Sequence, residues 1–63
     1  MLSGKELKVK RILLDVEARE IANHIGISKS YISLMEKGAR RIPDDKYDVW
    51  IQYLNRKEHS MGE

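Results

Sequence analysis

The stretch that decides the fold is EIANHIGISKSYISLMEKG, which runs from residue 20 to residue 38. Its first half places Ile21 and Ile25 four residues apart, on one face of a helix, and Ala22 beside them is small enough for a second helix to approach closely. This spacing predicts a short helix whose apolar face packs against another helix.

A tight turn follows at Gly26, where the chain commonly needs the left-handed conformation that glycine adopts without steric cost. Ile27 is an apolar residue within the turn, and Ser28 is a good N-cap because its hydroxyl can accept a hydrogen bond from a first-turn amide. The next helix carries an apolar edge at Ile32 and Met35 and ends before another glycine. Two short helices joined in this way predict a helix-turn-helix, the arrangement used by many DNA-binding proteins.

The flanking segments also predict helices. Ser3 and Glu6 have the spacing of a capping box, and mostly helical apolar spacing follows at Leu7, Ile12, Leu14 and Val16. Further along, Pro43 and the two acidic residues after it favour the start of a last helix that ends near Arg56.

These signals predict an all-α domain of four to five helices. The first three helices are expected at about residues 4–14, 18–25 and 29–37. The domain would span residues 1–57, with the helix-turn-helix at about 18–37, and residues 58–63 would form a flexible C-terminal tail.

Composition limits the classes of protein that fit. The chain has 63 residues and no cysteine, which excludes disulfides and zinc–thiolate sites and favours a reducing compartment. It has no run of about 18 apolar residues and no signal-peptide hydrophobic region, so we expect a cytoplasmic protein without a membrane segment. A net charge of +2 is a mild basic excess that does not by itself establish nucleic-acid binding.

Neither a metal site nor an active site is indicated. His24 and His59 have no second ligand at a persuasive spacing, and a small helical domain offers no support for a catalytic triad. We therefore expect no cofactor, no bound metal and no enzyme activity.

From about Leu7 to Pro43 the chain resembles the lambda-repressor-like helix-turn-helix family of phage repressors, Cro proteins and Xre-type regulators. The likeness rests on KRILL in the first helix, followed in order by IA, G, IS, a second IS and MEKG. The SKSYIS segment is similar to SinR-like biofilm regulators of bacilli. The resemblance implies a bacterial or phage-encoded transcriptional regulator, expected to be a repressor, that binds a specific double-stranded DNA operator.

In this family the third helix enters the major groove and contacts base edges from its start and from one turn later. The residues of this chain at those positions are Lys29, Ser30, Ser33 and Leu34. Lys29 can donate to guanine O6 and N7, the serines can pair with several bases, and Leu34 can offer apolar contact to a thymine methyl group.

The resemblance also implies phosphate contacts at the start of the second helix and after the third. The candidates are Arg19, Ser28, Lys37, Arg40 and Arg41. Each arginine has the alternative of being a solvated surface charge. Tyr31 also has two open interpretations, because its hydroxyl could contact a phosphate and its ring could cover the core.

Two further pairs of positions follow from the comparison with the family. Glu17 and Ala18 stand where its members usually carry Asn, Ser or Thr and then Gln, so the N-cap is poor and the Glu17 carboxylate would repel DNA unless Arg19 compensates. Arg11 and Glu36 fall where the family has an arginine–glutamate pair, and we expect them to form a structural pair.

The apolar residues of the last helix indicate whether the chain has a protein partner. One apolar stripe, which can close the core, consists of Tyr47, Trp50, Ile51 and Leu54. Val49 and Tyr53 form a second edge that the same face cannot bury. We therefore predict a homodimer, at least on DNA, with Val49 and Tyr53 at its interface. The alternative is that these two are scattered surface residues.

Two other interpretations stay open. The chain could be an interaction module of the same fold, an antirepressor or antitoxin-type protein that docks a regulatory protein through its last helix without reading DNA. It could also be the DNA-binding part of a longer repressor.

Overall fold

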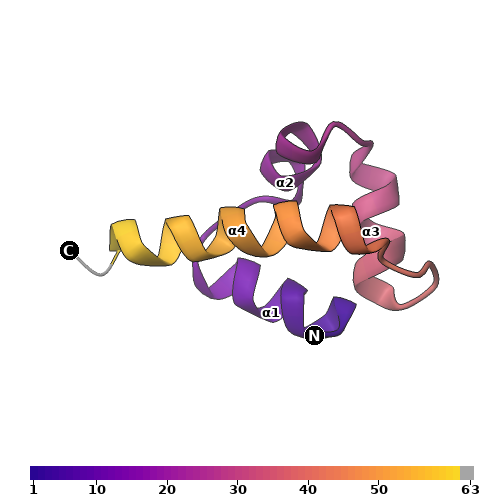
Figure 1. Ribbon diagram of the computed structural model, residues 1–63, viewed down its shortest axis with the longest axis horizontal. Coiled ribbons are helices and arrows are strands. Elements are labelled where there is room, and N and C mark those ends of the chain that lie inside the picture. The colour runs from indigo at the N-terminus through magenta and orange to yellow at the C-terminus, as the bar shows by residue number, and fades with distance from the viewer. Residues whose placement is uncertain (62–63) are drawn as a thin grey trace.

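The computed structural model describes residues 1–61, and within this range it contains four helices and no strand (Figure 1). The helices are α1 (Gly4–Leu13), α2 (Ala18–Ile25), α3 (Lys29–Lys37) and α4 (Asp44–Met61). The predicted all-α class is confirmed, and the bounds of the first three helices agree with the prediction to within one residue.

Helices α1 and α4 lie side by side and run in the same direction, each starting near α3 (Figure 1). At the start of the pair, the backbone N–H of Leu2 donates to the Tyr47 hydroxyl over 3.0 Å. Further along, Lys10 Nζ lies 2.7 Å from Glu58 Oε2. Helix α2 packs on α3 and α4, while α1 packs on α3 and α4 from another side.

The start of α1 is fixed by the predicted capping box. Ser3 Oγ accepts a hydrogen bond from the Glu6 N–H at 3.2 Å, and the Glu6 carboxylate accepts one from the Ser3 N–H at 2.9 Å. Gly4 lies so close to α3 that a Cβ atom there would collide with the carbonyl group of Met35. The glycine therefore permits the close crossing of α1 and α3.

The connection between α2 and α3 has the predicted geometry. Gly26 is left-handed, with φ 89° and ψ 34°, and its N–H donates to the Ala22 carbonyl over 2.8 Å. Ser28 then caps α3, because its hydroxyl accepts a hydrogen bond from the Tyr31 N–H at 3.1 Å. The connection between α2 and α3 thus consists of three residues, Gly26, Ile27 and Ser28.

The core draws on all four helices and on the connection between α1 and α2. Its buried apolar residues are Leu7, Val16, Ile21, Ala22, Ile32, Met35, Trp50 and Leu54. Ile12, which the sequence placed on the same apolar face as Leu7, is 53% exposed. The reason is that five helical residues turn the chain by about 140° beyond a full turn, so Ile12 points away from the core.

The predicted end of α4 near Arg56 is wrong, because the helix continues to Met61. Lys57 lies 5.5 Å above the ring of Tyr53, one turn back, and Glu58 pairs with Lys10 of α1. These contacts tie the additional turn to the rest of the domain. Residues 58–61 are therefore helical instead of a tail, and residues 62 and 63 lie outside the described residues.

Candidate nucleic-acid interface

Helix α3 separates the predicted base-contact residues from the core. Its inward side chains, Ile32, Met35 and Glu36, are buried. Spacing along the helix puts Ser30, Ser33 and Leu34 away from these residues, whereas Lys29, three residues before Ile32, is exposed because it begins the helix. Lys29 and Ser30 are exposed, Ser33 is half-buried and Leu34 is 42% exposed, so the four define one outward surface: Lys29, Ser30, Ser33 and Leu34.

A hollow of about 470 Å³ lies between the starts of α2 and α3. Its lining residues are Arg11, Glu17, Ala18, Arg19 and Lys29. The fold thus brings the phosphate candidate Arg19 next to the base candidate Lys29, although the two are ten residues apart in the chain. Ser28, the N-cap of α3, is exposed between α2 and this start of α3.

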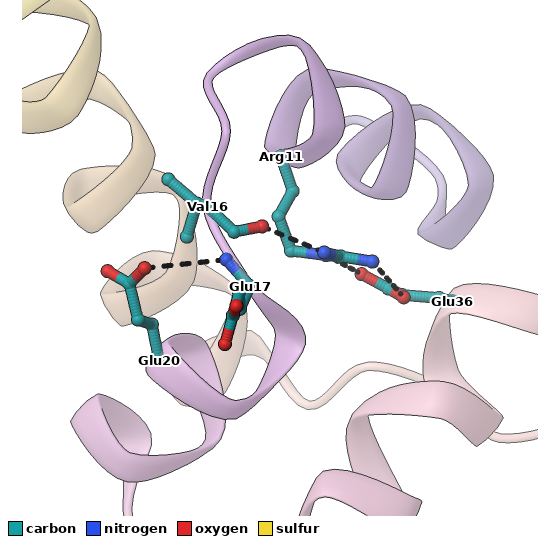
Figure 2. A network of polar contacts seen from close by, with 5 residues as sticks. All are labelled: Arg11, Val16, Glu17, Glu20 and Glu36. Atoms are coloured by element: carbon teal, nitrogen blue, oxygen red, sulfur yellow. Dashed lines mark hydrogen bonds and ion pairs between the residues drawn. The ribbon is translucent and has the colours of Figure 1, made fainter.

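Arg11 and Glu36 form the predicted pair. The Arg11 guanidinium donates to both carboxylate oxygens of Glu36, at 2.8 and 3.2 Å, and its third contact is the Val16 carbonyl at 2.8 Å (Figure 2). The side chains are only 11% and 4% exposed. The pair therefore joins α1, the α1–α2 connection and the end of α3, and so holds α3 against the scaffold.

Glu17 is the N-cap of α2, and Glu20 supplies one half of a capping box there, because its carboxylate accepts a hydrogen bond from the Glu17 backbone N–H at 3.4 Å (Figure 2). The Glu17 carboxylate lies 3.4 Å from Arg19, with both side chains largely exposed. An acidic group therefore stands beside the arginine that was predicted to contact phosphate.

The other end of α3 carries its own group of cations. Lys37, Arg40 and Arg41 are all exposed, and the Arg40 guanidinium lies 5.5 Å from the centre of the Tyr31 ring. Tyr31 is half-buried and packs against the core, in line with the interpretation that its ring covers the core. A phosphate contact by its hydroxyl stays a prediction.

The structure does not gather all the candidate cations at one place. Arg40 and Arg41 line a second hollow of about 350 Å³, together with N-terminal residues and the start of α4. Arg19 and Lys29 lie at the first hollow. The two groups belong to opposite ends of the α3 backbone, which are about 13 Å apart, although the Arg40 side chain reaches back to Tyr31.

Tyr53, a predicted dimer residue, makes contacts within its own chain. Its hydroxyl donates to the Glu20 carboxylate at 2.8 Å, and its ring centre lies 4.5 Å from that of His24 on α2. Lys57 Nζ is 3.7 Å from the same carboxylate. Val49, the other predicted dimer residue, is 36% exposed.

The hydrogen bond from Tyr53 is the main reason that the pKa of Glu20 is lowered, and Lys57 adds to this effect. The same hydrogen bond raises the pKa of Tyr53. Sequence reasoning missed this cluster, because Glu20 and Tyr53 are 33 residues apart and no local spacing links them.

Within residues 1–61, no three or more His, Cys, Asp or Glu side chains come together in a way that could hold a metal ion. None of the helices described is both long and apolar enough to cross a membrane.

No family model matches the chain, and no curated protein or solved structure matches it either.

Proposed function

We propose that this chain is a sequence-specific, double-stranded DNA-binding regulator of the lambda-repressor-like class, most simply a repressor, whose helix α3 enters the major groove. The observation that carries the proposal is the outward surface of α3, with cations at both of its ends. A helix with its side chains is about 10 to 12 Å in diameter and the major groove of B-DNA is about 12 Å wide, so α3 can enter the groove. The cations beside its two ends would then lie near the phosphate backbone.

The contacts divide into two kinds. Lys29, Ser30, Ser33 and Leu34 would meet base edges, since none of these four side chains is buried in the core. Arg19 would contact phosphate from α2, with Ser28 beside it, and Lys37, Arg40 and Arg41 would do so from the other end of α3. Tyr31 is an additional candidate for a phosphate.

The experiment is a selection of bound sequences from a random duplex pool with the purified protein, followed by titration of the selected duplex at several salt concentrations. We expect one enriched sequence and a logarithm of affinity that falls with the logarithm of salt by about 0.9 per phosphate neutralised. An enriched palindrome with half-sites about one DNA turn apart would also support the homodimer on DNA. No enrichment, together with a flat salt response, would contradict the proposal.

A second candidate function has its own support. Glu17 places an exposed carboxylate beside Arg19, and Leu34 presents a large apolar side chain where base contacts are expected. Both features suit a protein-interaction module that does not read DNA, such as an antirepressor or antitoxin-type partner. Under this alternative, the protein would show no preference among duplexes in the same selection.

A further inference from the structure

We propose that the ring of Tyr31 is a platform that positions the Arg40 guanidinium for a DNA phosphate. This role rests on the proposed DNA binding and specifies how one contact of that interface is made. The Arg40 guanidinium lies over the Tyr31 ring, 5.5 Å from its centre. At separations up to about 6 Å the face of an aromatic ring attracts a cation. Tyr31 is therefore a positioning residue that acts through Arg40.

The backbone after α3 folds back so that Arg40 can reach this ring. Gly38 is left-handed, with φ 81° and ψ 9°, and reverses the chain at the end of the helix. The N–H groups of Ala39 and Arg40 then donate to the Leu34 carbonyl, over 2.9 and 3.3 Å. Leu34 follows Tyr31 by three residues, so the two are neighbours on the helix surface. The backbone of Arg40 is thus fixed close to the ring that its side chain covers.

The Tyr31 ring is itself held in place. Tyr31 is half-buried and packs against the core, and its backbone N–H donates to the hydroxyl of Ser28, the N-cap of α3. A side chain packed in this way has already lost rotamer freedom on folding, so it offers a fixed surface to a long arginine side chain. The ring limits where the guanidinium lies and leaves its charge intact.

The charge of Arg40 is available for a phosphate. The side chain is exposed, and it has no ion-pair partner among residues 1–61. A guanidinium that is already ordered loses less conformational entropy when it binds than one that moves freely. We therefore expect Arg40 to contribute more to the affinity for DNA than an exposed arginine without a platform.

Arg41 supplies that comparison within the same chain. It is exposed and lines the same hollow as Arg40, but no aromatic ring of the described residues lies beneath its guanidinium. The planar guanidinium of arginine stacks on a ring, whereas the ammonium of lysine is a compact point charge. Replacement by lysine should therefore be costly at Arg40 and nearly neutral at Arg41.

The first part of the test varies the ring. Anisotropy titration with the selected duplex should give the same affinity for Tyr31→Phe as for the wild type, because the ring is kept and only the hydroxyl is lost. Tyr31→Leu, which keeps an apolar cover over the core, should lower the affinity by about threefold to fivefold. Tyr31→Phe therefore separates the ring from the hydroxyl as the group that matters.

The second part varies the cation. Arg40→Lys should lower the affinity by about threefold, and Arg41→Lys, the matched control, should leave it unchanged. In the Tyr31→Leu background Arg40→Lys should cause no further loss, because the platform is already absent. A merely structural effect of Tyr31→Leu would not abolish the cost of Arg40→Lys.

A third measurement needs no DNA. The side-chain protons of Arg40 should be shifted upfield in NMR spectra of the free protein by the ring current of Tyr31. This shift should persist in Tyr31→Phe and disappear in Tyr31→Leu. It reports on the position of the guanidinium before any ligand binds.

Several results would overturn the proposal. These are equal affinities of the wild type and Tyr31→Leu, a cost of Arg40→Lys that persists in Tyr31→Leu, or no upfield shift of the Arg40 protons. Equal losses for Tyr31→Phe and Tyr31→Leu would assign the phosphate contact to the hydroxyl instead. Failure of the wild type to bind any duplex would contradict the proposed function and, with it, a phosphate contact by Arg40. Binding by the wild type that Tyr31→Leu does not weaken would remove the platform alone.

Discussion

The guanidinium of Arg11 binds both carboxylate oxygens of Glu36 across the interface between α1 and α3, and both side chains are almost fully removed from solvent. Arg11 also holds the Val16 carbonyl. A buried pair of this kind contributes uncertain net stability, since the desolvation of two charges offsets their attraction. Its clearer effect is to fix the position of α3 relative to α1.

Removing one partner of this pair should destabilise the domain strongly. Glu36→Ala leaves the Arg11 guanidinium poorly solvated and without its anion, and the free energy of unfolding should fall by about 3 to 5 kcal/mol. Urea unfolding followed by circular dichroism measures the loss.

The control for that measurement is the double variant Arg11→Met with Glu36→Leu, which replaces both charges with apolar groups. It should recover a large part of the lost stability, because no buried charge remains unpaired. If the double variant is as unstable as the sum of the two single variants, the pair is not acting as a unit.

Gly4→Ala should destabilise the protein although alanine is the better helix former. In an exposed helix interior the substitution would gain about 1 kcal/mol. Here the new Cβ would meet the Met35 carbonyl, so α1 and α3 must move apart, at a net cost of about 1 to 3 kcal/mol. Thermal unfolding checks this, with the exposed α1 position Lys8→Ala as a control expected to change stability by less than about 0.5 kcal/mol. A stabilised Gly4→Ala variant would contradict the close approach.

Tyr53→Phe should reduce stability by no more than about 1 kcal/mol at pH 7, since it removes one partly exposed hydrogen bond to Glu20. The effect should depend on pH in a defined way. The pKa of Glu20 is lowered from 4.5, so its contribution is present above pH 4.5 and is lost as pH falls through the folded-state pKa. The pKa of Tyr53 is raised from 10.0, so its contribution is present below pH 10 and is lost as pH rises through the folded-state pKa.

The free energies of unfolding of the wild type and of Tyr53→Phe, compared between pH 7 and pH 3, measure the contribution of this hydrogen bond directly. The two proteins should converge in stability at acid pH. A difference that stays constant from pH 7 down to pH 3 would show that the Glu20 carboxylate is not the acceptor that matters.

Lys29→Ala and Arg41→Ala should have different effects on DNA. Lys29 lies on the outward surface of α3, so its loss should cost about 1 to 3 kcal/mol on the selected duplex and relax specificity at one base position. Arg41→Ala should weaken binding to all duplexes similarly and reduce the salt slope by about 0.9. Competition titrations against random duplex distinguish them, and equal losses on both DNAs for Lys29→Ala would reassign that residue to phosphate.

Glu17→Gln should strengthen DNA binding. The change removes the carboxylate that lies 3.4 Å from Arg19 and so frees that arginine for phosphate. The salt slope should become steeper by up to about 0.9, with a gain in affinity at low salt. Asp45→Gln, which removes one exposed acid at the start of α4, is the matched control for net charge. An equal gain in the control would mean that Glu17 acts only through total charge.

Much of the local structure could be predicted from the sequence, because its partners lie within a few residues of each other. The Ser3 and Glu6 capping box, the left-handed Gly26 and the Ser28 cap each depend on groups no more than four positions apart. Such contacts follow from residue type and helical spacing alone. The Arg11 and Glu36 pair was different, because it came from the resemblance to a family and not from spacing.

Other features could not be read from local spacing. The prediction that the last helix ends near Arg56 failed because the contacts that extend it reach across the fold, from Glu58 to Lys10 over 48 positions. The predicted dimer role of Tyr53 did not anticipate its hydrogen bond to Glu20 on α2.

The sequence by itself determined where the first three helices lie and how α2 turns into α3. Tertiary structure alone decided that Arg19 lies beside Lys29 at one hollow, that Arg40 and Arg41 lie beside the N-terminal residues at another, and that α1 has an apolar face away from the core. The physical reason is that helix caps and turns are contacts between near neighbours. The surroundings of a charge or an exposed apolar residue depend on which distant elements pack against it.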